Sequence, residues 1–208
     1  MKTKVFLFPL PSTVYMPVIR KPLRIFEPRY LDMIKTAVSD NIPVALCYGL
    51  SEYEDDTIGI DHESLHYVKS VCGCAKVTIV EETQDNELII YLEPYKKIIL
   101  ESIISEGLSY NVATAQEIIE FETILPQNFL RINQLRDFFL TWAKAYFKNT
   151  KELEDVSKVS LDYSILIALV SEFVLYDPDI KQQVLEFDDI NDKLRYVEEV
   201  LFNLEDEI

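Results

Sequence analysis

The residue pattern with the clearest chemical potential is His-Glu-x-x-His at residues 62–66. On a helix, His62 and His66 could bind one zinc ion together, and Glu63 could activate a zinc-bound water for hydrolysis. The residues that follow are rich in aromatic and β-branched types, however, and predict a strand over residues 65–72. Residues four apart in a strand lie about 13 Å from each other, which is too far for one ion. We therefore expect no metal site and no cofactor, and a zinc hydrolase that uses this motif is the alternative function.

The sequence offers no other catalytic arrangement. His62 and His66 are the two histidines of the chain, so a Ser-His-Asp or Cys-His site would have to use one of them, and no pattern marks a nucleophile beside either. A phosphate-binding loop needs glycines within about six residues of each other, whereas the closest pair, Gly49 and Gly59, is ten residues apart. The glycine spacing therefore excludes the P-loop and the dinucleotide-binding fingerprint, and no catalytic residue is predicted.

The charge balance argues against nucleic acid as a partner. The chain has 20 basic and 36 acidic residues, a net charge of −16, and nucleic acid is bound largely through contacts of Lys and Arg with phosphate. Residues 1–35 carry seven basic and two acidic side chains, while residues 116–208 carry nine basic and twenty acidic ones. We expect no nucleic-acid partner, and RNA binding is the second alternative function.

Cysteine usage and hydropathy predict the compartment. The three cysteines, Cys47, Cys72 and Cys74, are an odd number in a long chain, which is typical of a reducing compartment, and free cysteines often behave as small buried apolar residues. Prolines interrupt the apolar stretch at the start of the chain, so this stretch does not have the pattern of a signal peptide. No stretch approaches the ~20 apolar residues of a membrane span. These features predict a cytoplasmic protein without a membrane partner.

The first half of the chain is predicted to be mainly strands. Short runs rich in β-branched residues predict a hairpin with its turn at residues 84–86. One helix interrupts the strands: it begins at Pro28, where a missing N–H costs nothing, buries Tyr30, Leu31, Ile34 and Val38 on one face, and ends near Asp40. The predicted strands cover residues 3–8, 43–48, 65–72, 75–80, 87–92, 96–103 and 108–115.

The second half is predicted to be helical, because from about residue 126 apolar residues recur at three- and four-residue steps. A helix of about twenty residues begins near Phe129, residues 148–160 form a polar connector, and residues 161–176 form a buried central helix. Asp177 caps the next helix with Pro178 at its first position, and Asp188 caps the last one. Strands followed by helices indicate an α+β fold, and we expect two domains, residues 1–118 and 119–208.

A motif rich in proline and aromatic residues spans about 28 residues near the start of the chain. It consists of Leu7-Phe8-Pro9-Leu10, Tyr15-Met16-Pro17 and Pro22-Leu23-Arg24-Ile25-Phe26-Glu27-Pro28-Arg29-Tyr30-Leu31-Asp32-Met33-Ile34. The motif closely resembles the opening of the N-terminal, substrate-binding domain of Lon proteases. Residues 73–77 and 181–186 resemble further elements of that family, whereas residues 93–98 lack its usual Gly and Arg-Phe.

The resemblance implies a fold and a function. The fold would be a PUA-like β pseudo-barrel with one inserted helix, followed by an α-helical bundle. The function would be that of a non-catalytic binder of polypeptide or unfolded segments, without the ATPase and peptidase domains, with a protease or another protein as a further partner; no oligomeric state is implied. The motif residues are expected to be mainly structural, with Phe6 also facing the core and Glu27 and Arg29 pairing at a strand-to-helix corner: Phe8, Pro9, Pro22, Leu23, Ile25, Phe26, Glu27, Arg29 and Tyr30.

Overall fold

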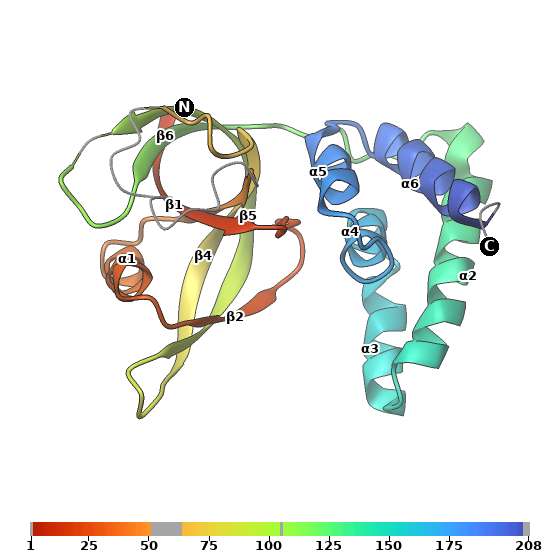
Figure 1. The fold of residues 1–208 in the computed structure, drawn as a ribbon. Helices are drawn as coiled ribbons and strands as arrows, with labels where there is room; N and C mark the ends of the chain where they lie inside the picture. The colour runs from red at the N-terminus through yellow and green to blue at the C-terminus, as the bar shows by residue number, and fades with distance from the viewer. Residues whose placement is uncertain (1, 51–63, 105, 206–208) are drawn as a thin grey trace. The chain divides into compact units, whose positions relative to one another are not determined.

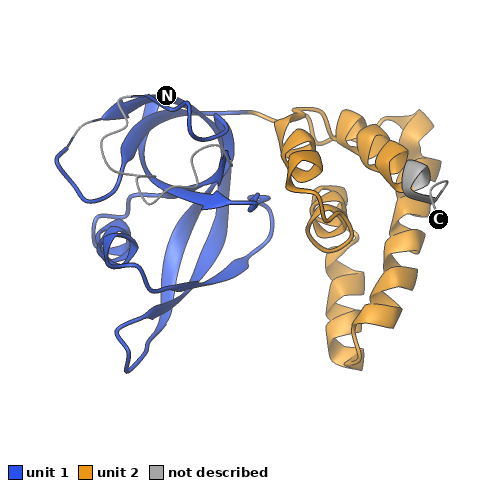
Figure 2. Cartoon of the chain, viewed as in Figure 1, with its two compact units in different colours: residues 1–118 blue, residues 119–208 orange. Residues whose placement is uncertain are grey.

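Two compact units make up the chain, of which the computed structural model describes residues 2–50, 64–104 and 106–205. Unit 1 comprises residues 1–118 and unit 2 comprises residues 119–208 (Figure 2). In the described part of unit 1 the chain forms a six-stranded sheet and one α-helix, and the regular elements described in unit 2 are helices. The α+β class predicted from the order of strands and helices is therefore confirmed.

Unit 1 is built on a mixed sheet with the strand order β2-β5-β4-β3-β1-β6 (Figure 1). β1 and β3 are parallel, and the other neighbours are antiparallel. The second half of β5 also pairs with β6, so five strands form a closed ring of pairings, and β2 pairs with the first half of β5. The strands are β1 (Lys2–Pro11), β2 (Lys21–Ile25), β3 (Val44–Gly49), β4 (Val71–Glu82), β5 (Leu88–Ile104) and β6 (Val112–Glu117).

β5 is one continuous strand, where the sequence predicted two strands separated at Pro94. The pairing with β4 shifts by one residue at this point, so that Cys74 pairs with Lys96 and Ala75 with Pro94. Tyr95 is therefore the extra residue of a bulge, and a bulge tolerates a proline that cannot donate a hydrogen bond. The predicted turn at residues 84–86 is confirmed: Asn86 has a φ of 59°, in the left-handed region that Asn tolerates in turns.

Helix α1 (Pro28–Ser39) begins with Pro28, as predicted. It buries Tyr30, Met33, Ile34 and Ala37 against the sheet. Val38, predicted on the buried face, is 44% exposed, because burial follows Met33 and Ala37, one position earlier on each turn. Phe6, Phe8 and Ile25 are buried in the same apolar cluster and Leu23 packs against it, which agrees with the core role expected of them.

The connection between β1 and β2 crosses the sheet at Gly73. Tyr15, in this connection, is 1% exposed, and its hydroxyl donates to the carbonyl oxygen of Leu92 at 3.3 Å. A Cβ added at Gly73 would lie 2.2 Å from the backbone oxygen of Tyr15. Gly73 is therefore required for this close approach of two backbones.

Residues 119–205 of unit 2 form five α-helices, with a short 3₁₀ turn at Pro126–Asn128 before the first. The predicted central helix is shorter than expected, because Asp162 caps it by accepting from the Ile165 N–H at 3.0 Å and leaves Leu161 outside. It is nevertheless buried over residues 166–171, as predicted. The helices are α2 (Phe129–Tyr146), α3 (Thr150–Val159), α4 (Tyr163–Phe173), α5 (Pro178–Glu186) and α6 (Ile190–Glu205).

Two features of unit 2 differ from the prediction. The polar segment 148–160, expected as a connector, contains α3, whose Asn149 caps the helix by accepting from the Lys151 N–H at 3.0 Å. The cap of α6 is formed by Asp189 and not by Asp188: a carboxylate oxygen of Asp189 accepts from the Asn191 N–H at 2.8 Å. The cap of α5 by Asp177, with Pro178 after it, is confirmed.

Asn191 joins the start of α6 to the segment that precedes α2. Its side-chain oxygen accepts from the Leu125 N–H at 3.0 Å and from the Asn128 amide at 2.9 Å. Its side-chain nitrogen donates to the Thr123 carbonyl at 3.0 Å. Asn191 is 4% exposed, so these hydrogen bonds satisfy a buried amide and fix the segment on unit 2.

Candidate functional site

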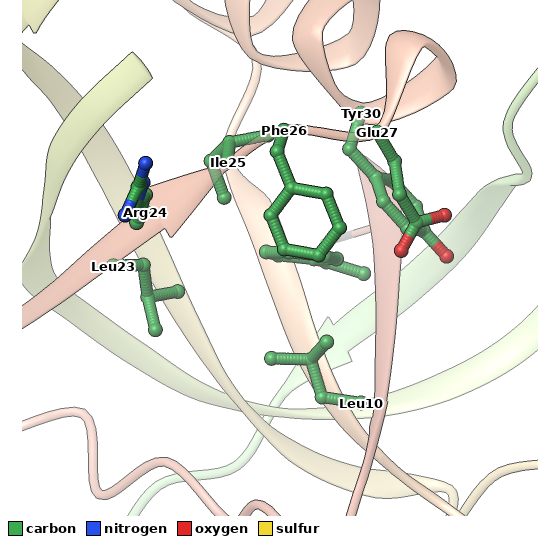
Figure 3. A pocket seen from close by; sticks show the side chains of 8 residues that line it. Leu10, Leu23, Arg24, Ile25, Phe26, Glu27 and Tyr30 are labelled. Atoms are coloured by element: carbon green, nitrogen blue, oxygen red, sulfur yellow. The ribbon is translucent and has the colours of Figure 1, made fainter. Parts of the chain in front are cut away.

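A small apolar pocket opens in unit 1 where the end of β1, the strand β2 and the start of α1 meet (Figure 3). Its volume is about 100 Å³. Cofactors and drug-sized ligands occupy pockets of about 300–1,000 Å³, and an engineered cavity of about 150 Å³ holds one benzene. The pocket is therefore of the size of a single small side chain. It is lined by Phe8, Leu10, Leu23, Arg24, Ile25, Phe26, Glu27 and Tyr30.

The two-residue period of the strands places the apolar lining. Phe8 and Leu10 lie on the same face of β1, and Leu23 and Ile25 lie on the same face of β2, because side chains of alternate residues point to one side of a strand. Tyr30 enters from the first turn of α1, and its ring centroid lies 4.6 Å from that of Phe8.

Phe26 is the exposed aromatic residue at this pocket. It follows the last residue of β2 and is 65% exposed, whereas Ile25 before it is 2% exposed. Figure 3 shows its ring between the side chains of Ile25 and Tyr30, at the turn that leads into α1. A large apolar ring beside an apolar pocket is a surface that can make contact with an apolar ligand.

The charged groups at the pocket are engaged within the chain. Glu27 accepts from the Arg29 guanidinium at 2.9 Å, which is the corner pairing expected from the sequence. The same guanidinium lies 4.7 Å from the centre of the Tyr30 ring, and Arg24 pairs with Glu87, the residue before β5. These ion pairs hold the turn between β2 and α1 in place.

Burial raises the pKa of Tyr30 to about 12, although the neighbouring Arg29 lowers it. The phenol thus remains protonated at neutral pH and cannot act as a general base there. The pocket offers apolar contact and one phenol group, a composition suited to binding.

Most motif residues lie at this pocket, although the sequence did not show that they would form one. Phe8, Leu23, Ile25, Phe26, Glu27 and Tyr30 line it, while Pro9, Pro22 and Arg29 lie beside these residues in the chain. Leu10 and Arg24, which also line the pocket, belong to the motif but were not among the residues singled out from it. Leu10 could have been found from its spacing, because it lies two residues after Phe8 and side chains two residues apart in a strand point to the same face.

The His-Glu-x-x-His motif lies partly outside the described residues, which begin again at Ser64, so His62 and Glu63 cannot be placed. His66 is exposed in a turn, where its Nδ1 contacts the Ser64 hydroxyl. The strand predicted over 65–72 is wrong: only Val68 forms an isolated bridge, with Gly49, before β4 begins at Val71. The aromatic and β-branched residues suggested a strand, but Tyr67 and Val68 lie in an irregular segment and are buried there without forming one.

The three cysteines lie together in an apolar cluster that includes Tyr67. All three are free thiols and at most 1% exposed. A hydrogen bond with Cys47, together with burial, raises the pKa of Cys72, and burial raises that of Cys74 to about 12. The thiols of Cys72 and Cys74 therefore stay protonated at neutral pH. Among the described residues, no group of three His, Cys, Asp or Glu side chains is arranged to hold a metal ion.

The basic residues near the start of the chain are paired with carboxylates of β4 and β5. Arg20 pairs with Glu93 at 2.9 Å and Lys35 with Glu82 at 2.8 Å, and Lys2 pairs with Glu101 at 3.0 Å. The positive charge of residues 1–35 is thus distributed over ion pairs. In the described part of the chain, none of the helices is long and apolar enough to cross a membrane.

The chain is similar to Lon proteins along most of its length. It is 27% identical to the Lon protease of Acinetobacter baumannii (strain AB307-0294) over 168 residues, which is 79% of this chain but 20% of that protein. The chain therefore spans about a fifth of the length of this curated relative.

Two solved structures share the fold. The Lon N-terminal domain protein from Xanthomonas campestris has a TM-score of 0.61 at 17% identity, covering 96% of this chain and 97% of that one. The N-terminal domain of the Mycobacterium avium complex Lon protease has a TM-score of 0.67 at 14% identity, covering 94% and 96%. The family model of the ATP-dependent protease La (LON) substrate-binding domain matches residues 4–202. The chain therefore belongs to the family of Lon substrate-binding domains.

Proposed function

We propose that this chain is a non-catalytic binding protein that captures apolar side chains of unfolded or extended polypeptide segments in the pocket between β1, β2 and α1. The family supports a substrate-binding role, and a protease is the partner that the relatives suggest for presenting such segments. We further propose that unit 1 is a PUA-like pseudo-barrel domain and unit 2 a helical bundle domain. The closed ring of strand pairings and the helices of unit 2 support this assignment.

The observation that carries the proposal is Phe26, 65% exposed beside an apolar pocket. A phenyl ring that is 65% exposed contributes little burial energy to unit 1. Contact with an apolar ligand in the adjacent pocket would bury more of this ring. The residues around it are fixed by the Glu27–Arg29 pair and by the packing of Tyr30 on Phe8, so the pocket is formed before a ligand arrives.

The expected affinity is low for a single segment. Burying one aliphatic side chain contributes about 1.5–3 kcal/mol, and 1 mM corresponds to about 4 kcal/mol. A segment with one inserted side chain should therefore bind with a dissociation constant of about 1 mM or weaker. Unfolded proteins, with many exposed apolar side chains, should be retained better than their folded forms.

Two single substitutions test the proposal. Phe26→Ala should reduce the capture of a reduced and alkylated, permanently unfolded protein at least threefold, measured by pull-down on the immobilised chain (about 0.7 kcal/mol). Leu130→Ala is the matched control, because Leu130 is an apolar residue of α2 with 70% exposure. Equal capture by wild type and the Phe26 variant, or a loss confined to the Leu130 variant, would refute the location of the site.

A further inference from the structure

Two strand edges border the pocket. β2 is the last strand in the sheet order and pairs with β5 alone among the described strands. β1 pairs with β6 over Lys2 to Phe6 and with β3 over Phe6 to Pro11, so its last residues have one paired edge. An extended peptide can join such an edge through main-chain hydrogen bonds.

The edge of β1, however, carries few donors. Phe6 donates its N–H to Pro43 on the β3 side at 3.1 Å, and Leu7 donates to Asn111 on the β6 side at 2.9 Å. Successive N–H groups of a strand point to opposite edges, so the nitrogens of Pro9 and Pro11 share the side of Leu7. Proline has no N–H. Beyond Leu7, this edge therefore offers carbonyl oxygens without the donors that a strand ladder needs.

The edge strand β2 also contains residues that are unfavourable for strand addition. Pro22, which pairs with Tyr91, has no N–H and leaves this strand of five residues with one donor fewer. Lys21 and Arg24 are charged residues of the same strand, and Arg24 pairs with Glu87. Proline and charged side chains on an edge strand are common means of preventing the addition of further strands.

We infer that the pocket recognises one inserted aliphatic side chain and not a strand added to the sheet. This inference rests on the proposed function. The pocket volume of about 100 Å³ fits a single side chain. Apart from Arg24, Glu27 and the Tyr30 hydroxyl, the side chains that line the pocket are apolar. The net charge of −16 attracts basic segments to the chain as a whole, so a ligand whose apolar residue stands between basic ones is favoured by long-range attraction and not by a charge at the pocket. The ligand class is thus a basic, flexible segment with an exposed Val-, Leu- or Ile-sized side chain, in any backbone conformation.

Replacing amides by esters in the ligand tests this inference on the unaltered protein. The probe is a short Ser/Lys peptide with one central Leu, and its partner has ester bonds in place of the amides at Leu and at both neighbours, which removes three N–H donors. In ¹H–¹⁵N NMR titrations of the full chain, the two peptides should bind within about threefold of each other, because no ligand N–H is used. A peptide with Ser in place of Leu should cause no saturable shifts.

The possible results distinguish a wrong mode of recognition from a wrong proposed function. If the amide peptide binds and the ester peptide binds about tenfold or more weakly, the segment adds as a strand and the inference is wrong, while the proposed function stands. If neither the peptides nor an unfolded protein cause shifts, the proposed function is wrong as well. If the Ser peptide bound as tightly as the Leu peptide, the pocket would not recognise the aliphatic side chain, and the inference would be wrong.

Discussion

At the scale of single residues, close packing explains several positions that chemistry does not. Gly73 stands where two backbones meet, and Tyr15 fills the space above it. Tyr30 is both a core residue and part of the pocket lining, and Phe26, next to this core, is exposed. The motif near the start of the chain therefore combines residues that build unit 1 with one that is free to make contact with a ligand.

Gly73→Ala should destabilise the chain by about 2–4 kcal/mol, because the new Cβ would force the Tyr15 backbone away from β4. Urea unfolding followed by far-UV circular dichroism measures the change. Gly49→Ala is the control, because its Cβ would meet its nearest neighbours at an ordinary 3.6 Å, and it should cost less than about 1 kcal/mol. Similar losses in the two variants would contradict the close approach at Gly73.

The pH dependence of stability should report the buried phenol of Tyr30. Its pKa is raised by burial to about 12, above the value near 10 of an unfolded tyrosine. The folded state therefore holds the Tyr30 proton more tightly than the unfolded state does. The stabilisation of the folded state by this protonated phenol is complete below pH 10 and is lost as the pH rises through 12.

Tyr30→Phe should accordingly lose less stability than wild type between about pH 8 and pH 11, by about 1 kcal/mol in urea unfolding. Tyr176→Phe, at a position that is 85% exposed, should follow the wild-type curve. A Tyr30 variant with the same alkaline decline as wild type would show that this phenol ionises freely.

At the scale of elements, the sequence was most informative where local chemistry acts alone. Pro28 and Pro178 marked helix starts, and the turn at 84–86 was evident from its Asp and Asn. β2 was not predicted, because five residues with a proline among them give no strand signal. α3 was missed because the segment was judged by its polarity, although Asn149 was a usable cap signal.

The pocket could be predicted only in part, because local sequence patterns do not show which distant segments come together. The motif drew attention to Phe8 on β1 and to Phe26 and Tyr30 after β2, yet it did not show that the end of β1 and the strand β2 would lie side by side. That proximity depends on β2 pairing with β5, whose partner residues lie 63 to 71 positions further along the chain, and on β5 pairing in turn with β4. Long-range pairings of this kind leave no local signal.

Asn191→Ala should destabilise unit 2 by about 2–3 kcal/mol, because it leaves the Leu125 N–H and the Thr123 carbonyl without their partner. Trp142, the single tryptophan, lies in unit 2 among aromatic rings, so its fluorescence during urea unfolding reports this unit. Asn133→Ala, at an exposed position of α2, should change stability by less than about 0.5 kcal/mol. No difference between the two variants would refute the linking role of Asn191.

At the scale of the whole molecule, charge should select among ligands. The net charge of −16 attracts basic segments, and the Debye length falls from about 30 Å at 0.01 M salt to about 3 Å at 1 M. A Lys-rich Leu peptide should bind more tightly than its Glu-rich counterpart at low salt, and the difference should fall at least threefold by about 0.5 M salt. A preference for the basic peptide that persists at high salt would show direct ion pairing instead.

Binding of unfolded polypeptide at the corner between β2 and α1 can be mapped residue by residue with NMR. On addition of a permanently unfolded protein to the ¹⁵N-labelled chain, the largest shifts should fall on residues 8–10 and 23–30, the segments that contain the pocket lining. Shifts confined to unit 2, or none at saturating ligand, would contradict binding at this corner.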